Sequence, residues 1–77
     1  MPIRRVMLTY GPEVSSEPII HSVGQQFGLV TNIHRADATE ERGWIELELV
    51  GKEKDIEAGI AWLISRGVRI DPVGEGQ

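Results

Sequence analysis

Residues 44–50 read WIELELV, in which Ile45, Leu47 and Leu49 alternate with Glu46 and Glu48. A period of two is what a strand requires when one face of its sheet is buried and the other is exposed. The polar segment 37–43 (DATEERG) precedes the run, and Gly51 follows it. These residues therefore predict a half-buried strand that a turn joins, as a hairpin, to the strand before it.

Three further strands are predicted outward from this one. Residues 3–10 (IRRVMLTY) alternate in the same way and end at a Gly-Pro pair, and residues 29–38 form the other arm of the hairpin. Residues 68–72 (VRIDP) form the last strand. Because proline cannot donate to a ladder, Pro72 requires that this strand end there or lie at an edge of the sheet.

Two helices are predicted between the strands. Residues 18–27 and residues 53–66 each place apolar side chains three and four positions apart, the spacing of one helix face. Gly28 and Gly67 follow them, as glycine commonly does at the left-handed end of a helix. Gly59 lies inside the second helix, where it costs about 1 kcal/mol relative to alanine. Close packing against the sheet is expected to compensate for that cost.

The order βαββαβ predicts an α+β fold of the ferredoxin-like type, an antiparallel four-stranded sheet in spatial order 4-1-3-2 with two helices on one face. The other face is expected to carry polar side chains and a few large apolar ones, with Arg5 opposite Glu46 or Glu48. Its predicted members are Arg5, Met7, Thr9, Trp44, Glu46, Glu48, Arg69 and Asp71. Such a face is a candidate surface for a dimer or another partner. The residues proposed for an interface are Met7, Thr9 and Trp44 on this face and, on the second helix, Trp62, for which the alternative is a place at the partly exposed rim of the core.

Length and composition restrict the remaining possibilities. A chain of 77 residues supports one domain, with an expected core at 3–73 and a flexible tail at 74–77. It has no cysteine, which excludes disulfides and thiolate metal sites within this sequence, so that oligomerisation is the remaining way to add stability. The net charge of -4, with scattered basic residues, argues against nucleic acid as a partner. No signal peptide or bilayer-long apolar run is visible, so we expect a soluble cytoplasmic protein without membrane insertion.

No group of side chains resembles a catalytic or metal site. His21 has serine neighbours, but residues adjacent on a helix point apart, and a nucleophile needs a base within hydrogen-bond reach. His34 lies near Asp37 and Glu40 at a spacing that matches no standard metal motif. The sequence therefore predicts no enzyme, no catalytic residue, no metal and no cofactor.

A set of strings spread over the chain carries a family resemblance. They are RVMLTYG (5–11), EPII (17–20), GLVTNI (28–33), WIELELVG (44–51), AGIAWL (58–63) and RGVRI (66–70). Together they resemble the NIL domain, which is the C-terminal regulatory module of methionine-importing ABC transporter ATPases and is also found fused to ferredoxins. The resemblance extends over residues 4–73.

The resemblance implies a ferredoxin-like fold, similar to that of amino-acid-sensing ACT domains, which pairs with a second copy and binds methionine near the dimer contact. Asn32 matches the family position implicated in that binding, where its amide can hydrogen-bond the carboxylate or ammonium group of an amino acid. Ile33 and nearby apolar atoms are expected to hold the thioether. The alternative for Asn32 is a local hydrogen bond to neighbouring backbone at the start of the strand.

The sequence thus predicts a homodimeric sensor or adaptor that binds a small amino acid, with methionine as first candidate. Since the sequence contains neither an ATPase nor a ferredoxin segment, we expect a stand-alone NIL-like domain that acts on a separate protein partner. The alternative is a ligand-free interaction module that docks on a transporter ATPase or a ferredoxin.

Overall fold

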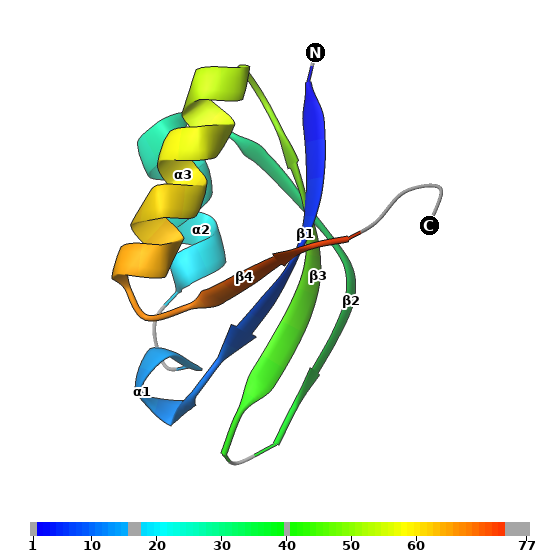
Figure 1. Ribbon diagram of the computed structural model, residues 1–77, viewed down its shortest axis with the longest axis vertical. Coiled ribbons are helices and arrows are strands. Elements are labelled where there is room, and N and C mark those ends of the chain that lie inside the picture. The colour runs from blue at the N-terminus through cyan, green and yellow to red at the C-terminus, as the bar shows by residue number, and fades with distance from the viewer. Residues whose placement is uncertain (1, 16–17, 40, 74–77) are drawn as a thin grey trace.

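The computed structural model describes residues 2–15, 18–39 and 41–73. The elements are β1 (Ile3–Tyr10), α1 (Pro12–Ser15), α2 (Ile19–Phe27), β2 (Val30–Ala38), β3 (Gly43–Val50), α3 (Glu53–Ser65) and β4 (Arg69–Pro72). All pairings in the four-stranded sheet are antiparallel, in the order β2-β3-β1-β4. Helices α2 and α3 lie side by side on one side of the sheet, and no described helix crosses the other side (Figure 1). The predicted ferredoxin-like fold is confirmed, whereas the predicted tail at 74–77 lies outside the described residues.

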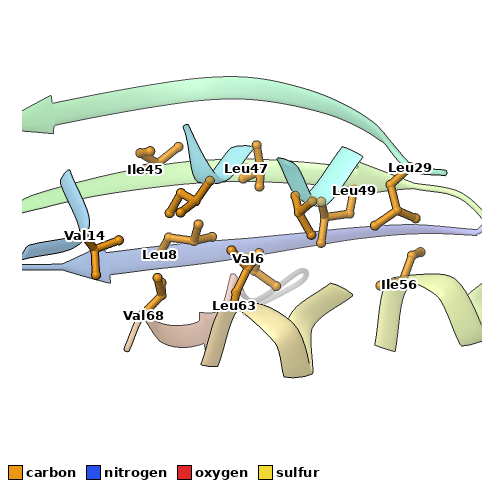
Figure 2. Close-up of a cluster of buried hydrophobic side chains, with 12 residues drawn as sticks. Val6, Leu8, Val14, Leu29, Ile45, Leu47, Leu49, Ile56, Leu63 and Val68 are labelled. Atoms are coloured by element: carbon orange, nitrogen blue, oxygen red, sulfur yellow. The ribbon is translucent and has the colours of Figure 1, made fainter. Parts of the chain in front are cut away.

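The core fills the space between the sheet and the helices. Leu8 of β1 and Leu47 and Leu49 of β3 are completely buried, as the alternation in both strands predicts. They share one buried cluster with Ile56 and Leu63 of α3 (Figure 2). Completing the core are Val6, Val14, Ile19, Val23, Leu29, Ile45 and Val68.

Two glycines make room for Leu29, the residue that joins α2 to β2. A Cβ added at Gly51 would lie 2.6 Å from Leu29 Cδ2, and one added at Gly59 would lie 3.0 Å from Leu29 Cδ1. A Cβ at Gly59 would also lie 3.1 Å from Val23 Cγ2 on α2. The cost of a glycine inside α3 is therefore offset by packing against α2 and Leu29, and not by contact with the sheet as the sequence suggested.

The segment between β1 and α2 differs from the prediction. It contains an additional one-turn helix, α1, which holds the buried Val14 against the core. Helix α2 begins at Ile19, one residue later than predicted, with Pro18 at its N-cap and Gly28 left-handed at its C-cap. A single helical turn is too short to show a repeating apolar pattern, so α1 could not be predicted from the sequence.

Strand β2 lies at an edge of the sheet and contains a β-bulge. Its pairing with β3 shifts between Ile33 and Arg35, which leaves His34 as the extra residue. The bulge places Arg35 on the same face as Asn32, although the two are three positions apart in the sequence. This change of face explains why residues 29–38 show no clear alternation.

A candidate functional site on the uncovered sheet face

The strand register arranges the side chains of the uncovered face, here termed the open face, in four rows across the sheet. Residues paired across neighbouring antiparallel strands share a face, so each row runs from one strand to the next. The rows are Val30, Val50 and Ile3; Asn32, Glu48 and Arg5; Arg35, Glu46, Met7 and Asp71; and Asp37, Trp44, Thr9 and Arg69. The first row is apolar and the second is polar and charged.

The second row and the bulge residue form a connected cluster, the Asn32 cluster, of Asn32, His34, Glu48 and Arg5. Asn32 Nδ2 donates to Glu48 Oε1 at 3.4 Å, and His34 Nε2 lies 3.2 Å from the same oxygen. Arg5 Nη2 lies 3.5 Å from the same His34 nitrogen, Nε2. An amide, an imidazole, a carboxylate and a guanidinium thus converge on one exposed patch.

Glu46, in the third row, is buried, with 7% of its surface exposed. Its Oε1 accepts a 2.8 Å hydrogen bond from Arg35 Nε, and its Oε2 lies 3.8 Å from Arg5 Nη1. The hydrogen bond from Arg35 lowers the pKa of the Glu46 carboxyl, the nearby positive charges lower it further, and desolvation opposes them. Glu46 lies on the uncovered sheet face as predicted, but it is not exposed there: it is buried and bonded to Arg35, whose Cζ lies 5.6 Å from the Trp44 ring centroid.

The first row, here termed the apolar row, borders the Asn32 cluster. Ile3 and Val30 are each 60% exposed, and Val50 between them is half-buried. Two of the most exposed large apolar side chains in the described part of the chain therefore stand beside a group of charged residues. Adjoining apolar and charged patches of this kind are typical of a binding surface.

The predicted ligand residues project to opposite faces of β2. Asn32 lies on the open face beside Glu48, whereas Ile33 pairs with Leu47, lies on the helix side of the sheet and is 56% exposed. The structure therefore does not bring the two side chains together, and the apolar atoms beside Asn32 belong to Val30 and its row. The Asn32 side chain donates a hydrogen bond to the Glu48 side chain. The alternative considered from the sequence was a hydrogen bond to neighbouring backbone.

The predicted interface residues divide between the two sides of the molecule. Met7, Thr9 and Trp44 share the open face, and Thr9 pairs with Trp44 in the register. Trp62 lies on the helix side, where its ring centroid is 6.2 Å from that of Phe27. No single flat surface contains all four residues.

Two hollows lie on the helix side of the sheet. The larger, a groove of about 440 Å³, separates α2 from β2 and is lined by Ile20, His21, Gly24, Gln25, Gly28, Leu29, Val30 and Thr31. The smaller, about 130 Å³, is lined mainly by apolar residues, among them Tyr10, Val14, Ile19 and Ile45. Neither contains Asn32.

Within residues 2–15, 18–39 and 41–73, no group of three or more histidine, aspartate or glutamate side chains is placed to hold a metal ion. His21 on α2 and His34 on the open face are on different sides of the sheet and do not converge. No described helix is long and apolar enough to cross a membrane.

A comparison with protein families identifies the chain. The model of the NIL domain matches residues 4–72. The chain belongs to the NIL domain family. Membership supports a role as a regulatory domain, the coarser part of the function expected from the sequence.

A solved structure resembles this NIL domain over almost its full length. It is the C-terminal domain of an ABC transporter ATP-binding protein from Enterococcus faecalis, with 24% sequence identity and a TM-score of 0.81. The match covers 94% of this chain and 84% of that one, and at this identity it establishes the shared fold. No curated protein matches the chain.

Sequence reasoning identified Asn32 in this NIL domain through the family resemblance, but it did not identify most of the neighbours that make the site. Strand order predicted Arg5 opposite Glu46 or Glu48, and the register places it opposite Glu48. The approach of His34 to Glu48 depends on the bulge, for which the sequence gives only an indirect signal, the failing alternation of residues 29–38.

Proposed function

We propose that this NIL domain is a homodimeric sensor or adaptor that binds a small amino acid, with methionine as first candidate, and so regulates a protein partner. The observation that carries the proposal is the position of Asn32, which lies in one row with Glu48 and Arg5, beside His34, and borders the exposed apolar row. An amino acid with an apolar side chain has the same two-part character. The arrangement suits such a ligand on the open face.

The chemistry of the patch accounts for both parts of a methionine molecule. The apolar row offers a surface for the thioether chain, and burying apolar area contributes about 25 cal/mol per Å². The Asn32 amide supplies a donor and an acceptor for the polar end of the ligand. Because the face is open, a ligand bound there stays partly exposed unless a second surface covers it.

A second copy of the chain is the proposed cover. The open face displays Met7, Thr9 and Trp44, and no described helix shields it. A domain of this size has a small core and gains stability from association. Regulation then follows if the ligand binds with different affinity to the paired and unpaired states.

Calorimetric titration tests the proposal directly. L-Methionine at millimolar concentration should release or absorb heat and raise the unfolding temperature, and Asn32→Ala should weaken binding by about tenfold, the loss typical of one hydrogen bond. Gln26→Ala, an exposed change on α2, is the matched control and should bind like the wild type. Absence of both heat and a thermal shift with every amino acid tested would exclude the sensor function, and unchanged affinity in Asn32→Ala would move the site elsewhere.

The second candidate is a ligand-free interaction module that docks through the edge strand β2. Of its nine residues only Thr31 is not exposed, and an edge strand offers unpaired backbone groups to another strand. A transporter ATPase or a ferredoxin is the expected partner. Binding to such a partner that is indifferent to every amino acid tested would favour this function over the sensor.

A further inference from the structure

We propose that the Asn32 cluster selects free α-amino acids by charge, with Glu48 binding the ligand's ammonium group and Arg5 its carboxylate. This inference rests on the proposed function, since it names the ligand class of the same site. It goes further by assigning the two charged contacts, which the family resemblance does not supply.

The order of groups across the sheet is the first argument. Asn32, Glu48 and Arg5 are register partners on β2, β3 and β1, so an amide, an anion and a cation stand in line. Neighbouring strands are about 4.8 Å apart, and long side chains span that distance easily. The ammonium and carboxylate groups of an α-amino acid are attached to the same carbon. A ligand over this row therefore meets a negative group and a positive group in a fixed order.

The second argument is that the charged groups of this face differ in how closely they are already paired with one another. Arg35 holds the buried Glu46 at 2.8 Å, so that carboxylate is already satisfied. Arg5 lies farther from Glu46, at 3.8 Å, and its contact with His34 is 3.5 Å long. Its guanidinium has five N–H donors, and in the described part of the chain its side-chain contacts are these two long ones. Arg5 is thus the cation of this face best placed to take up a ligand carboxylate.

The surroundings of Glu48 are the third argument. Its Oε1 accepts a hydrogen bond from Asn32 Nδ2 and lies 3.2 Å from His34 Nε2, and its side chain is 20% exposed. Because Asn32 Nδ2 is directed at Glu48, the amide oxygen of Asn32 is left to accept from an ammonium group beside it. Glu48 and Asn32 then act as a pair of acceptors, and the apolar row lies next to them for the ligand side chain.

Binding of charge-modified ligands tests the inference. Wild-type protein is titrated with L-methionine, N-acetyl-L-methionine, which lacks the ammonium charge, and L-methioninamide, which lacks the carboxylate. Hydrogen bonds to charged groups are strong, so each analogue should bind about 10- to 100-fold more weakly than methionine. Glu48→Gln should abolish the preference over the acetylated analogue, and Arg5→Gln should abolish the preference over the amide.

Asp71→Asn is the matched control, because Asp71 is an open-face carboxylate that pairs with Arg69 at the far edge of the sheet. It should keep both preferences. Equal binding of the three ligands to the wild type would overturn the inference without any variant, as would preferences that survive in Glu48→Gln and Arg5→Gln. If no amino acid binds the wild type, the proposed function itself fails. Weakened analogue binding together with the selective losses supports the assignment.

Discussion

Replacing Leu29 by alanine and Gly59 by alanine, singly and together, tests how the helix layer is packed. Leu29 is 7% exposed and fills the space that the two glycines leave open. Leu29→Ala removes a buried side chain and should lower the free energy of unfolding by about 2–5 kcal/mol.

The effect of Gly59→Ala depends on Leu29. In the wild type, the gain of about 1 kcal/mol from helix propensity is opposed by crowding, because the new Cβ would lie 3.0 Å from Leu29 Cδ1 and 3.1 Å from Val23 Cγ2. We expect a net change of about 0 to 1 kcal/mol in the destabilising direction. With Leu29→Ala present, the closest of these contacts is gone and the added methyl partly fills the cavity, so the same change should stabilise. The coupling should be about 0.5–1.5 kcal/mol.

Urea unfolding followed by tryptophan fluorescence measures all four proteins of this cycle. Trp62 packs on Phe27 in the same helix layer and reports on it. Ala58→Gly, at an exposed position of α3, is the control: it should cost about 1 kcal/mol and show no coupling to Leu29. Additive effects of Leu29→Ala and Gly59→Ala, within about 0.3 kcal/mol, would refute the packing argument.

Three further predictions concern the sheet. Glu46→Gln should destabilise the protein at neutral pH, because the folded state lowers the pKa of this carboxyl. The loss of unfolding free energy relative to wild type should shrink as the pH falls through the range where folded Glu46 becomes protonated. A loss that does not change with pH in urea unfolding would contradict this. Leu47→Ala should lower the free energy of unfolding by about 2–5 kcal/mol, because the side chain is fully buried, and a loss under about 1 kcal/mol in the same assay would count against the core described. In sedimentation with tens of micromolar protein, the double variant Met7→Asp, Trp44→Asp should be a monomer, whereas Trp62→Ala should remain a dimer like the wild type. A monomeric wild type, or dissociation by Trp62→Ala alone, would argue against pairing through the open face.

The sheet could be predicted from the sequence because apolar residues recur at every second position in its two central strands, at Val6, Leu8 and Tyr10 in β1 and at Ile45, Leu47 and Leu49 in β3. Because Leu8 and Leu47 must both face the helices, the side chains of each face could be predicted, but a slip of two residues keeps the same faces and leaves Arg5 opposite Glu46 or Glu48. The structure places it opposite Glu48. Helix α1 could not be predicted, since its four residues are too few to show a period, and only the buried Val14 distinguishes it.

The site was predicted less completely than the fold, for one physical reason. The bulge at His34 changes which residues of β2 reach the open face, and a one-residue shift reverses every later side chain. It places Arg35 over Glu46, which buries a carboxylate that alternation alone assigns to solvent. The neighbours of Asn32 are therefore set by pairing between strands and not by any local pattern in the sequence.

The most direct test of the central claim, that the ligand binds on the open face, is to titrate isotope-labelled protein with L-methionine and follow its backbone amide resonances. Ligand binding there should place the largest shifts on Asn32, Glu48 and Val50, at one end of the open face. Shifts concentrated on Gly24 and Gln25, in the groove between α2 and β2, would contradict it.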